Sequence, residues 1–438
     1  MKVLKFGGTS VGSAQRMKDV AKLITNGERK IVVLSAMSGT TNSLVEISDY
    51  LYRKNHDGAN EVINRLQAKY SAVIDELYST DEYRRKAHEH ITGILNQIRA
   101  LVKDLFTLFE ERIILAQGEL MSSNIMNLYL NEMGVKSIII PALDYMRTDK
   151  NAEPDTSFIK EKFSALIKQH DDAEIIVTQG FICRNAYGEI DNLLRGGSDY
   201  TASLVGAAVH AEEIQIWTDI DGMHNNDPRI VENTTPVRRL NFDEAAELAY
   251  FGAKILHPTC ILPAKLNNIP VRLLNTMQPE APGTTISNET EKAKIKAVAA
   301  KDNIIAIKIK SGRMLLATGF MRKVFEIFES HHTPIDVVTT SEVGISVTID
   351  NRKHLDEVVD DLKKYGTVTV DENMVIICVV GDFEWENVGF EAKIVDALKD
   401  IPVRMISYGG SNYNVSILIR ASDKKRALQS LSEHLFNN

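Results

Sequence analysis

Residues 3–10 read Val-Leu-Lys-Phe-Gly-Gly-Thr-Ser, and they decide which fold the chain is expected to adopt. The apolar side chains around Lys5 predict a short buried strand. A charge inside such a strand is costly unless an anion meets it. Gly7 and Gly8 permit a turn that β-carbons would block, and they let the backbone approach a ligand closely. Two hydroxyl side chains, the second of them Ser10, then stand where a helix would begin, as candidate N-cap residues.

This stretch predicts a phosphate cradle made of backbone N–H groups, a helix N-terminus and one fixed positive charge. It is not a Walker A loop, because no Gly-Lys-Ser/Thr closes it. The alternative is an edge strand from which Lys5 reaches out to solvent. A strand, a glycine turn and a helix in this order favour an open α/β sheet, which binds ligands at the carboxyl ends of its strands.

The composition narrows the class of protein. The chain has 438 residues, of which 44 % are hydrophobic and 25 % are charged, as in an ordinary globular protein of roughly two to four domains. Its net charge of -8 disfavours a nucleic acid or an anionic membrane as partner. The three cysteines lie far apart, which fits a reducing cytoplasm better than a disulfide framework or a metal motif. No apolar run approaches the roughly 18 residues of a membrane helix, and no signal peptide is expected.

Two further segments place polar groups where ligands would bind. The strand predicted at 31–34 ends in a turn rich in small residues and hydroxyls, residues 35–42, whose alternative interpretation is a simple capped turn. Residues 44–115 are polar and helical in period, and they show no chemistry of their own. Glu119, which follows Gly118 at the end of this helical segment, is either a solvated acid in a first helical turn or a ligand-binding carboxylate.

A second glycine cradle lies at residues 194–201, Leu-Arg-Gly-Gly-Ser-Asp-Tyr-Thr, at the start of a predicted helix. Arg195 suits bidentate recognition of a carboxylate or a phosphate. Asp199 is either the N-cap of that helix or an organiser of catalysis. Two glycine cradles in one α/β domain, one with Lys5 and one with Arg195 and Asp199, favour the catalytic interpretation.

The loop after the strand predicted at 214–218 carries carboxylates, an imidazole and a guanidinium between Asp219 and Arg229. It would clasp the ribose and phosphates of a nucleotide, and its first carboxylates, at 219 and 221, would suit Mg²⁺, which prefers oxygen ligands. The alternative is a pair of solvent-exposed turns. Lys254, near the end of an amphipathic helix, is either a helix-dipole cation or a phosphate ligand.

The pattern changes after Lys301, where short strands and helices alternate. Strands are expected at 304–310, 313–317, 335–340, 343–349, 367–370, 374–380, 403–407 and 413–419, and helices at 319–331, 352–363, 387–398 and 422–434. These elements make two βαββαβ units, one inserted into the other, and such pairs commonly sense a small ligand at their shared edge. The turn before Phe320 offers N–H groups to a carboxylate, and Asp336 would bind an amino group, although ordinary caps and turns are the alternative.

Seven motifs in order resemble the aspartate kinases (aspartokinases) of the amino-acid kinase fold: Lys5-Phe-Gly-Gly-Thr-Ser10, Ser35-Ala-Met-Ser-Gly39, Gly118-Glu119, Arg195-Gly-Gly-Ser-Asp-Tyr-Thr201, Trp217-Thr-Asp219, Asp227-Pro-Arg229 and Phe251-Gly-Ala-Lys-Ile-Leu-His-Pro258. The resemblance covers essentially the whole chain. It implies an α/β three-layer sandwich with an open, mainly parallel sheet, followed by two interleaved βαββαβ ACT domains. The implied domains are 1–290 for catalysis, 313–370 for the inserted first ACT domain, and 300–312 plus 371–438 for the second. Residues 146–155 and 336–342 are most similar to the lysine-sensitive, single-function class, with no homoserine dehydrogenase expected to follow.

The implied activity is ATP-dependent phosphorylation of the side-chain carboxylate of L-aspartate to 4-phospho-L-aspartate, the first step in the biosynthesis of lysine, threonine and methionine. ATP and Mg²⁺ would be the cofactors, and the enzyme would be cytoplasmic. L-Lysine would act as feedback inhibitor at the ACT domains, whose edge-to-edge pairing would make at least a homodimer. No nucleic acid and no membrane is expected as partner.

The resemblance also assigns roles to individual residues. Lys5 would bridge the phosphates in the transition state, and Asp199 would orient it. The residues implied to bind aspartate are Ser35, Thr41, Glu119 (at the ammonium), Arg195 (at the α-carboxylate) and Ser198. The residues implied to bind the nucleotide are Lys5, Gly7, Gly8, Ser10, Gly196, Gly197, Thr218, Asp219, Arg229 and Lys254. The residues implied to bind the effector are Phe320, Met321, Phe325, Asp336, Thr340 and Ser341, and no residue is assigned as a metal ligand.

Two other functions stay open. The first is a catalytically silent amino-acid sensor, which the intact charged residues disfavour because a degenerate site should have lost one of them. The second is a related kinase of glutamate or acetylglutamate, which the paired ACT tail and the motif at Glu119 disfavour. One departure from the family pattern is His224, which stands in the nucleotide loop where many members carry a tyrosine.

Overall fold

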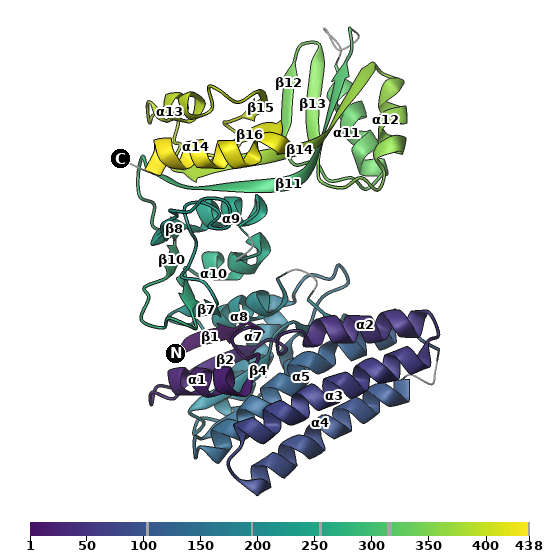
Figure 1. Cartoon of the computed structure of the whole chain (residues 1–438), viewed down its shortest axis with the longest axis vertical. Helices are drawn as coiled ribbons and strands as arrows, with labels where there is room; N and C mark the ends of the chain where they lie inside the picture. Colours follow the sequence, from purple (N-terminus) through teal and green to yellow (C-terminus); the bar gives the residue numbers. More distant parts are fainter. Residues whose placement is uncertain (102–104, 194–195, 254–255, 313–317, 437–438) are drawn as a thin grey trace. The chain divides into compact units, whose positions relative to one another are not determined.

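The computed structural model describes residues 1–101, 105–193, 196–253, 256–312 and 318–436 (Figure 1). Its contacts divide the chain into two units. The first comprises Met1–Met223 and Leu256–Asn288, and the second comprises His224–Ile255 and Glu289–Asn438. The second unit therefore takes one segment from within the catalytic domain predicted at 1–290, and the predicted domain boundaries stay a prediction.

The first unit is built on a mainly parallel sheet whose strands run in the order β3-β4-β2-β1-β7-β9-β10. Neighbouring strands are parallel from β3 to β9, and β10 is antiparallel to β9. The strands are β1 (Lys2–Phe6), β2 (Lys30–Leu34), β3 (Ser137–Ile139), β4 (Ile175–Gln179), β7 (Ile214–Thr218), β9 (Val271–Asn275) and β10 (Thr284–Ser287). A separate hairpin joins β5 (Ile182–Arg184) to β6 (Ile190–Asn192). Continuous apolar runs such as residues 31–34 of β2 suit strands that are buried on both faces.

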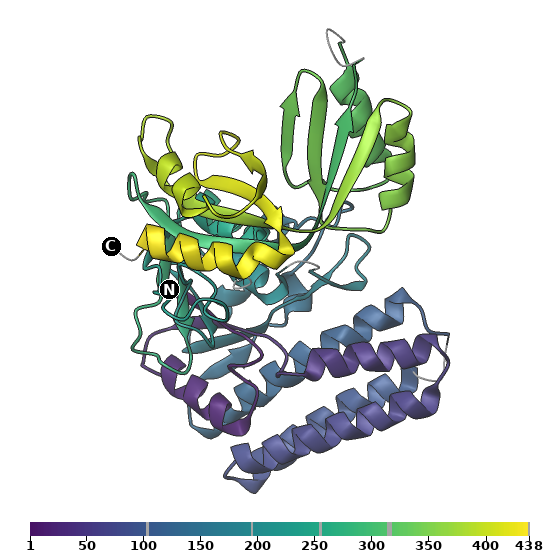
Figure 2. The ribbon, with the colours of Figure 1, turned by 45° about the horizontal axis from the view of Figure 1, so that its top comes forward.

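Helices cover this sheet and extend beyond it. They are α1 (Ala14–Ile24), α2 (Thr40–Tyr52), α3 (His56–Leu77), α4 (Asp81–Leu101), α5 (Leu108–Glu132), α6 (Ala142–Tyr145), α7 (Thr156–Lys168), α8 (Gly197–Ala208) and α10 (Leu262–Leu266), with a 3₁₀ turn at Pro258–Ile261. The long helices α2 to α5 lie side by side in both views (Figures 1 and 2). Val62 of α3, Ile91 of α4 and Ile125 of α5 belong to one buried core, so the polar segment predicted as helical is a packed bundle.

Alternation along β1 decides which way Lys5 points. Leu4 and Phe6 belong to the core that also contains side chains of α1 and α5. Because successive side chains of a strand point to opposite faces of a sheet, Lys5 points to the other face. The first turn of α8 carries Asp199, which reaches Lys5 on that face.

The second unit contains a six-stranded sheet in the order β12-β13-β11-β14-β16-β15, with every recorded pairing antiparallel. Its strands are β11 (Ile295–Lys310), β12 (Val338–Ser341), β13 (Gly344–Ile349), β14 (Thr367–Gly381), β15 (Val403–Ser407) and β16 (Asn414–Arg420). Its helices are α9 (Phe242–Tyr250), α11 (Phe320–Ser330), α12 (Leu355–Lys363), α13 (Phe390–Ala397) and α14 (Lys424–Phe436), with a 3₁₀ turn at Ala421–Asp423. The short β8 (Arg239–Asn241) precedes α9.

Two long strands, β11 and β14, serve both halves of this sheet. One core gathers Ile307 of β11 with Val324 and Val358, and the other gathers Val298 of β11 with Ile394. The prediction of separate strands at 367–370 and 374–380 was wrong, because β14 runs through both with only a local shift in register opposite Ile304. The strand predicted at 313–317 lies outside the described residues.

The predicted fold class is confirmed, both for the open, mainly parallel sheet and for the interleaved βαββαβ arrangement around an antiparallel sheet. None of the described helices is long and apolar enough to cross a membrane.

Candidate active site

The two glycine cradles predicted from separate parts of the sequence meet in the first unit. The ammonium nitrogen of Lys5 lies 2.7 Å from Oδ1 of Asp199, and the two side chains are only 11 % and 14 % exposed. Gly196 caps α8 in the left-handed region, with φ of 67°, and so turns the chain into the helix. This turn carries Asp199 to the carboxyl end of β1. This largely buried ion pair neutralises a charge that β1 would otherwise hold alone.

A pocket of about 490 Å³ opens beside this ion pair. Its walls come from the ends of β1 and β2, the start of α2, the middle of α5 and the start of α8. The lining residues are Lys5, Gly8, Thr9, Ser35, Ala36, Met37, Ser38, Gly39, Thr41, Asn42, Glu119, Phe181, Gly196, Gly197 and Ser198. The structure therefore brings together four residues predicted to bind aspartate, namely Ser35, Thr41, Glu119 and Ser198.

Gly8 is required by the close approach of the two turns. A β-carbon on Gly8 would lie 2.8 Å from the carbonyl oxygen of Ala36. The N–H of Ser38 donates to the carbonyl oxygen of Gly8 at 3.1 Å. Gly7 and Ser10 are not among the lining residues of the pocket, and the Ser10 hydroxyl instead lies 2.6 Å from Oγ1 of Thr276.

Glu119 is a buried carboxyl group with one oxygen left without a partner. Its Oε1 accepts a hydrogen bond from the N–H of Ala36 at 3.1 Å. Its Oε2 is buried and has no hydrogen-bond partner among the residues that the structure describes. Burial raises the pKa of Glu119 to about 8, against a smaller opposing effect of the Ala36 N–H. A buried acceptor in a pocket is suited to receive an ammonium group from a ligand.

Hydroxyl groups bridge the opposite walls of the pocket. Ser35 donates to Ser198 with 2.9 Å between the hydroxyl oxygens. The Ser122 hydroxyl donates to the carbonyl oxygen of Ser35 at 2.7 Å. A β-carbon on Gly180 would lie 2.4 Å from Oγ of Ser198, so this glycine makes room for the start of α8. Ser122 and Gly180 were not predicted as site residues, although Gly180 directly follows a buried strand, where sequence reasoning expects ligands.

The residues predicted to bind the nucleotide are only partly placed. Thr218 ends β7, where its hydroxyl accepts from the N–H of Ile220 at 3.3 Å, and Asp219 is exposed directly after it. Arg229 belongs to the second unit and pairs with Asp227 through Nε and one terminal nitrogen, at 2.9 and 2.8 Å. Lys254 and Arg195 lie outside the described residues.

The residues predicted to bind an effector lie in the second unit. Phe320 begins α11 and belongs to a buried core, whereas Met321 and Phe325 are partly exposed on that helix. Thr340 and Ser341 lie on β12 at an edge of the sheet.

Asp336 is the most constrained of the predicted effector residues. Its side chain is 3 % exposed, and Oδ1 accepts from the ammonium of Lys301 at 2.6 Å and from the Tyr250 hydroxyl at 2.7 Å. Lys301 also lies 3.0 Å from Oδ2 of Asp350. Burial, followed by the hydrogen bond to Asp336, raises the pKa of Tyr250 to about 12. Oδ2 of Asp336 is buried without a partner among the described residues, which marks a second place for an ammonium group.

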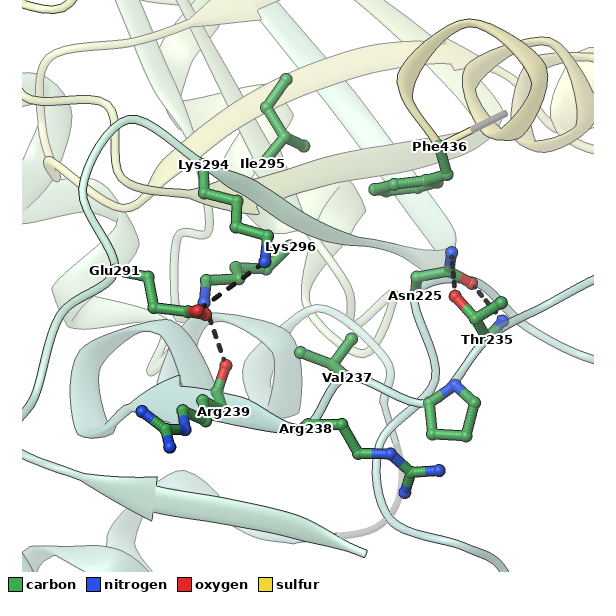
Figure 3. Close-up of a pocket in the computed structure, with 11 residues that line it drawn as sticks. Asn225, Thr235, Val237, Arg238, Arg239, Glu291, Lys294, Ile295, Lys296 and Phe436 are labelled. Atoms are coloured by element: carbon green, nitrogen blue, oxygen red, sulfur yellow. Dashed lines mark hydrogen bonds and ion pairs between the residues drawn. The ribbon is translucent and has the colours of Figure 1, made fainter. Parts of the chain in front are cut away.

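A further pocket of about 330 Å³ lies in the second unit between β8, the start of β11 and the end of α14 (Figure 3). Its lining is rich in cations, with Arg238, Arg239, Lys294 and Lys296. The buried ammonium of Lys296 already pairs with Glu291 and donates to the carbonyl oxygen of Arg239 at 3.2 Å. None of the eleven lining residues, all of them described, has a buried side-chain polar atom without a partner.

Comparisons with known proteins agree with this geometry. The model of the amino acid kinase family matches residues 1–275, and an ACT domain model matches residues 377–435. Aspartokinase 1 of Arabidopsis thaliana, a chloroplastic protein, is 36 % identical over 461 residues, which cover 100 % of this chain and 80 % of that protein.

Two solved structures of Escherichia coli aspartokinase III are also similar. The R-state structure with aspartate and ADP has a TM-score of 0.87 and 31 % identity, and the match covers 100 % of both chains. The T-state structure with lysine and aspartate has a TM-score of 0.81 and 32 % identity, and the match covers 100 % of this chain and 99 % of that one.

Proposed function

Because the chain belongs to the amino acid kinase family, and within it to the aspartokinases, we propose that it transfers the γ-phosphoryl group of ATP to the side-chain carboxylate of L-aspartate. The products are ADP and 4-phospho-L-aspartate. The observation that carries this proposal is the pocket that brings the Lys5–Asp199 ion pair together with the buried carboxyl group of Glu119, one oxygen of which has no partner among the described residues. One end of the pocket suits a transferring phosphoryl group, and the other suits the ammonium of an amino acid.

For this reaction the protein has to align the two reactants and neutralise negative charge on the transferring phosphoryl group. The nucleophile is the side-chain carboxylate of the substrate, which is already ionised at pH 7, so no general base is required. The barrier is lowered by holding two anions in line and by neutralising charge on the transferring group. Lys5 supplies that positive charge at the end of β1, and the carboxylate of Asp199 keeps its ammonium in place.

The substrate is recognised by groups that are complementary to each part of aspartate. Glu119 receives the ammonium group, since its free oxygen is buried with no other partner in the described part of the chain. The hydroxyls of Ser35, Thr41 and Ser198 line the same pocket and bind the carboxylates. We extend the proposal to Arg195, whose guanidinium would hold the α-carboxylate in a bidentate manner.

The nucleotide side is proposed from sequence and topology together. Backbone N–H groups of Gly7, Gly8 and the cradle at Gly196 and Gly197 would hold the phosphates, with Ser10 as a further donor. Thr218 ends β7 and Asp219 follows it, and because β7 is parallel to β1 these residues reach the same edge of the sheet as the first cradle. Arg229 and Lys254 would serve the remaining nucleotide groups.

Mg²⁺ fits this arrangement as a companion of ATP. Among the described residues, no cluster of three or more His, Cys, Asp or Glu side chains could hold a metal ion alone. Mg²⁺ in kinases is usually held by one or two carboxylates plus the substrate phosphates, and the exposed carboxylate of Asp219 at the phosphate edge meets that need. The ion would neutralise charge on the phosphate oxygens.

Regulation by L-lysine is proposed for the second unit. The relative from Escherichia coli was solved with lysine, and this chain places a buried, partly unpartnered carboxylate at Asp336. Phe320, Met321 and Phe325 of α11 and Thr340 and Ser341 of β12 would complete that site. Lysine would inhibit by binding more tightly to a less active arrangement of the enzyme.

Assembly and location complete the proposal. β12 and β15 are the outer strands of the six-stranded sheet, and their unpaired edges would join copies into a homodimer or a larger oligomer. The three cysteines, all of them in the described part of the chain, are buried and none is joined in a disulfide, which suits a reducing cytoplasm.

A coupled assay of ADP release tests the activity directly. The purified chain is given ATP and Mg²⁺ with L-aspartate, L-glutamate or N-acetylglutamate, and then aspartate with increasing lysine. We expect turnover with aspartate alone and inhibition at millimolar lysine. Turnover with glutamate or acetylglutamate instead would make it a different amino-acid kinase. No turnover with any acceptor would favour a catalytically silent sensor, and inhibition by threonine would overturn the lysine-sensitive assignment.

A further inference from the structure

The segment that carries the substrate hydroxyls, residues 35–42 (the substrate loop), is held mainly through its backbone. The N–H of Ala36 donates to Glu119, and the N–H of Ser38 donates to Gly8. The loop then enters α2 through Gly39, whose φ is 77° and which provides no side-chain cap for the helix. A loop with a left-handed glycine and an uncapped helix start needs other contacts to keep one conformation.

Two consecutive residues of α3 provide such contacts. Lys69 donates from its ammonium group to the carbonyl oxygen of Ser38. The Tyr70 hydroxyl lies 3.1 Å from Oγ1 of Thr40, the first residue of α2. Tyr70 is completely buried, so its hydroxyl depends on this partner. The helical segment that showed no chemistry in the sequence therefore touches the substrate loop on both sides of Gly39.

The charge of Lys69 also lies close to the pocket. A β-carbon on Gly39, a lining residue, would be 3.5 Å from the Lys69 ammonium nitrogen. Lys69 is half-buried, and this burial lowers the pKa of its ammonium group. A partly desolvated cation beside the loop raises the local positive potential that an amino-acid dicarboxylate would meet.

We propose that Lys69 and Tyr70 are positioning residues for the amino-acid substrate, so that α3 contributes to substrate binding. They act through the substrate loop, by keeping the hydroxyls of Ser35 and Thr41 in place. This inference rests on the proposed function, because it takes aspartate as the ligand of the pocket. It predicts that losing either contact weakens aspartate binding and leaves ATP binding unchanged.

The test compares Lys69→Met and Tyr70→Phe with a matched control on the same helix. Arg65 lies one turn earlier on α3 and pairs with Glu46 of α2 at 2.6 Å, so Arg65→Met removes a contact between the same helices without touching the loop. We expect KM for aspartate to rise roughly tenfold in Lys69→Met and severalfold in Tyr70→Phe, with KM for ATP unchanged. Arg65→Met should match the wild type in both constants, and Lys69→Arg should recover most of the loss because it keeps the donor and the charge.

Amide hydrogen exchange separates this inference from the proposed function, because it needs no turnover. We expect faster exchange at residues 36–42 in Lys69→Met and Tyr70→Phe than in Arg65→Met, with equal protection in the central strands. A wild-type enzyme that leaves aspartate unphosphorylated would overturn the proposed function, and the exchange data would still report on the loop. The positioning role would be overturned if Lys69→Met and Tyr70→Phe had the same exchange rates at residues 36–42 and the same KM for aspartate as Arg65→Met.

Discussion

The raised pKa of Glu119 predicts that aspartate binding is coupled to the release of a proton. With a pKa of about 8, the ligand-free carboxyl group is neutral at pH 7. An incoming ammonium favours the ionised form, so the bound complex needs Glu119 as a carboxylate. The substrate must therefore bind to the minor ionised population, and the apparent affinity equals the intrinsic affinity multiplied by the fraction of enzyme that is ionised.

The size of the effect follows from that one pKa. Glu119 is ionised in about 1 % of molecules at pH 6, about 9 % at pH 7 and about half at pH 8. The apparent dissociation constant for aspartate should then fall roughly fiftyfold between pH 6 and pH 8, with about fivefold of this between pH 7 and pH 8. At pH 7 we expect about 0.9 proton to be released for each aspartate bound.

Isothermal titration calorimetry measures this directly. Aspartate is titrated into the enzyme at pH 7 in two buffers that have different enthalpies of ionisation, and the difference in observed heat gives the number of protons released. The control is Glu119→Gln, which keeps the hydrogen bond to Ala36 but has no proton to lose. An apparent dissociation constant that stays level from pH 6 to pH 8, or an equal proton count in the variant, would refute the role assigned to Glu119.

The raised pKa of Glu119 also predicts how the stability of the ligand-free enzyme depends on pH. The direction of this dependence is opposite to that of an ordinary ion-paired acid. The pKa of Glu119 in the folded state lies above its usual value of 4.5, so the folded protein holds the proton more tightly than the unfolded chain. Its contribution to stability is therefore complete below about pH 4.5 and is lost as the pH rises through 8. Denaturant unfolding should show Glu119→Gln to be the more stable protein at pH 8, even though it binds aspartate poorly.

Three further predictions follow from single contacts. Lys5→Ala should lower turnover in the ADP-release assay by about 10²–10³-fold, and near-normal turnover would remove this lysine from the mechanism. Asp336→Ala should abolish inhibition by lysine. Lys301→Met removes the internal ammonium from Oδ1 of Asp336, so a lysine titration should show an inhibitory lysine concentration that is roughly tenfold lower. Unchanged inhibition in both variants would show that the effector binds elsewhere. Gly118→Ala would place a β-carbon 2.8 Å from that of Ala36 and so displace the substrate loop. Steady-state kinetics should then show a roughly tenfold higher KM for aspartate. An unchanged KM would mean that α5 moves instead of the loop.

Much of the site was predictable because its residues carry local signals. Lys5 is a charged residue inside an apolar run, and the glycine pairs at 7–8 and 196–197 predict turns before helices. Parallel strands bring their carboxyl ends to one edge, so the two cradles had to come close once the sheet order was assumed. The ion pair between Lys5 and Asp199 is the physical outcome of that topology.

Other features left no local signal. Lys69 and Tyr70 occupy ordinary positions in an amphipathic helix, and only the packing of α3 against α2 makes them contacts of the substrate loop. The continuity of β14 was missed because residues 371–373 are polar and resemble a turn, whereas Asp371 and Met374 both pair with β11 and so carry the strand across the local shift in register. Local propensity gives way here to the sheet around it.

The two candidate amino-acid sites keep an ammonium-binding carboxylate in different resting states. Glu119 and Asp336 each have one oxygen hydrogen-bonded and one buried without a partner among the described residues. Glu119 rests with a proton, because burial raises its pKa more than the hydrogen bond from Ala36 and the charge of Lys5 lower it. Asp336 rests as an ion pair with Lys301, so its charge is met by a cation that belongs to the chain. A ligand at Glu119 must therefore displace a proton, and a ligand at Oδ2 of Asp336 must share the carboxylate with the ammonium of Lys301. Substrate binding should consequently follow pH across the neutral range, while effector binding should depend on how firmly Lys301 is held.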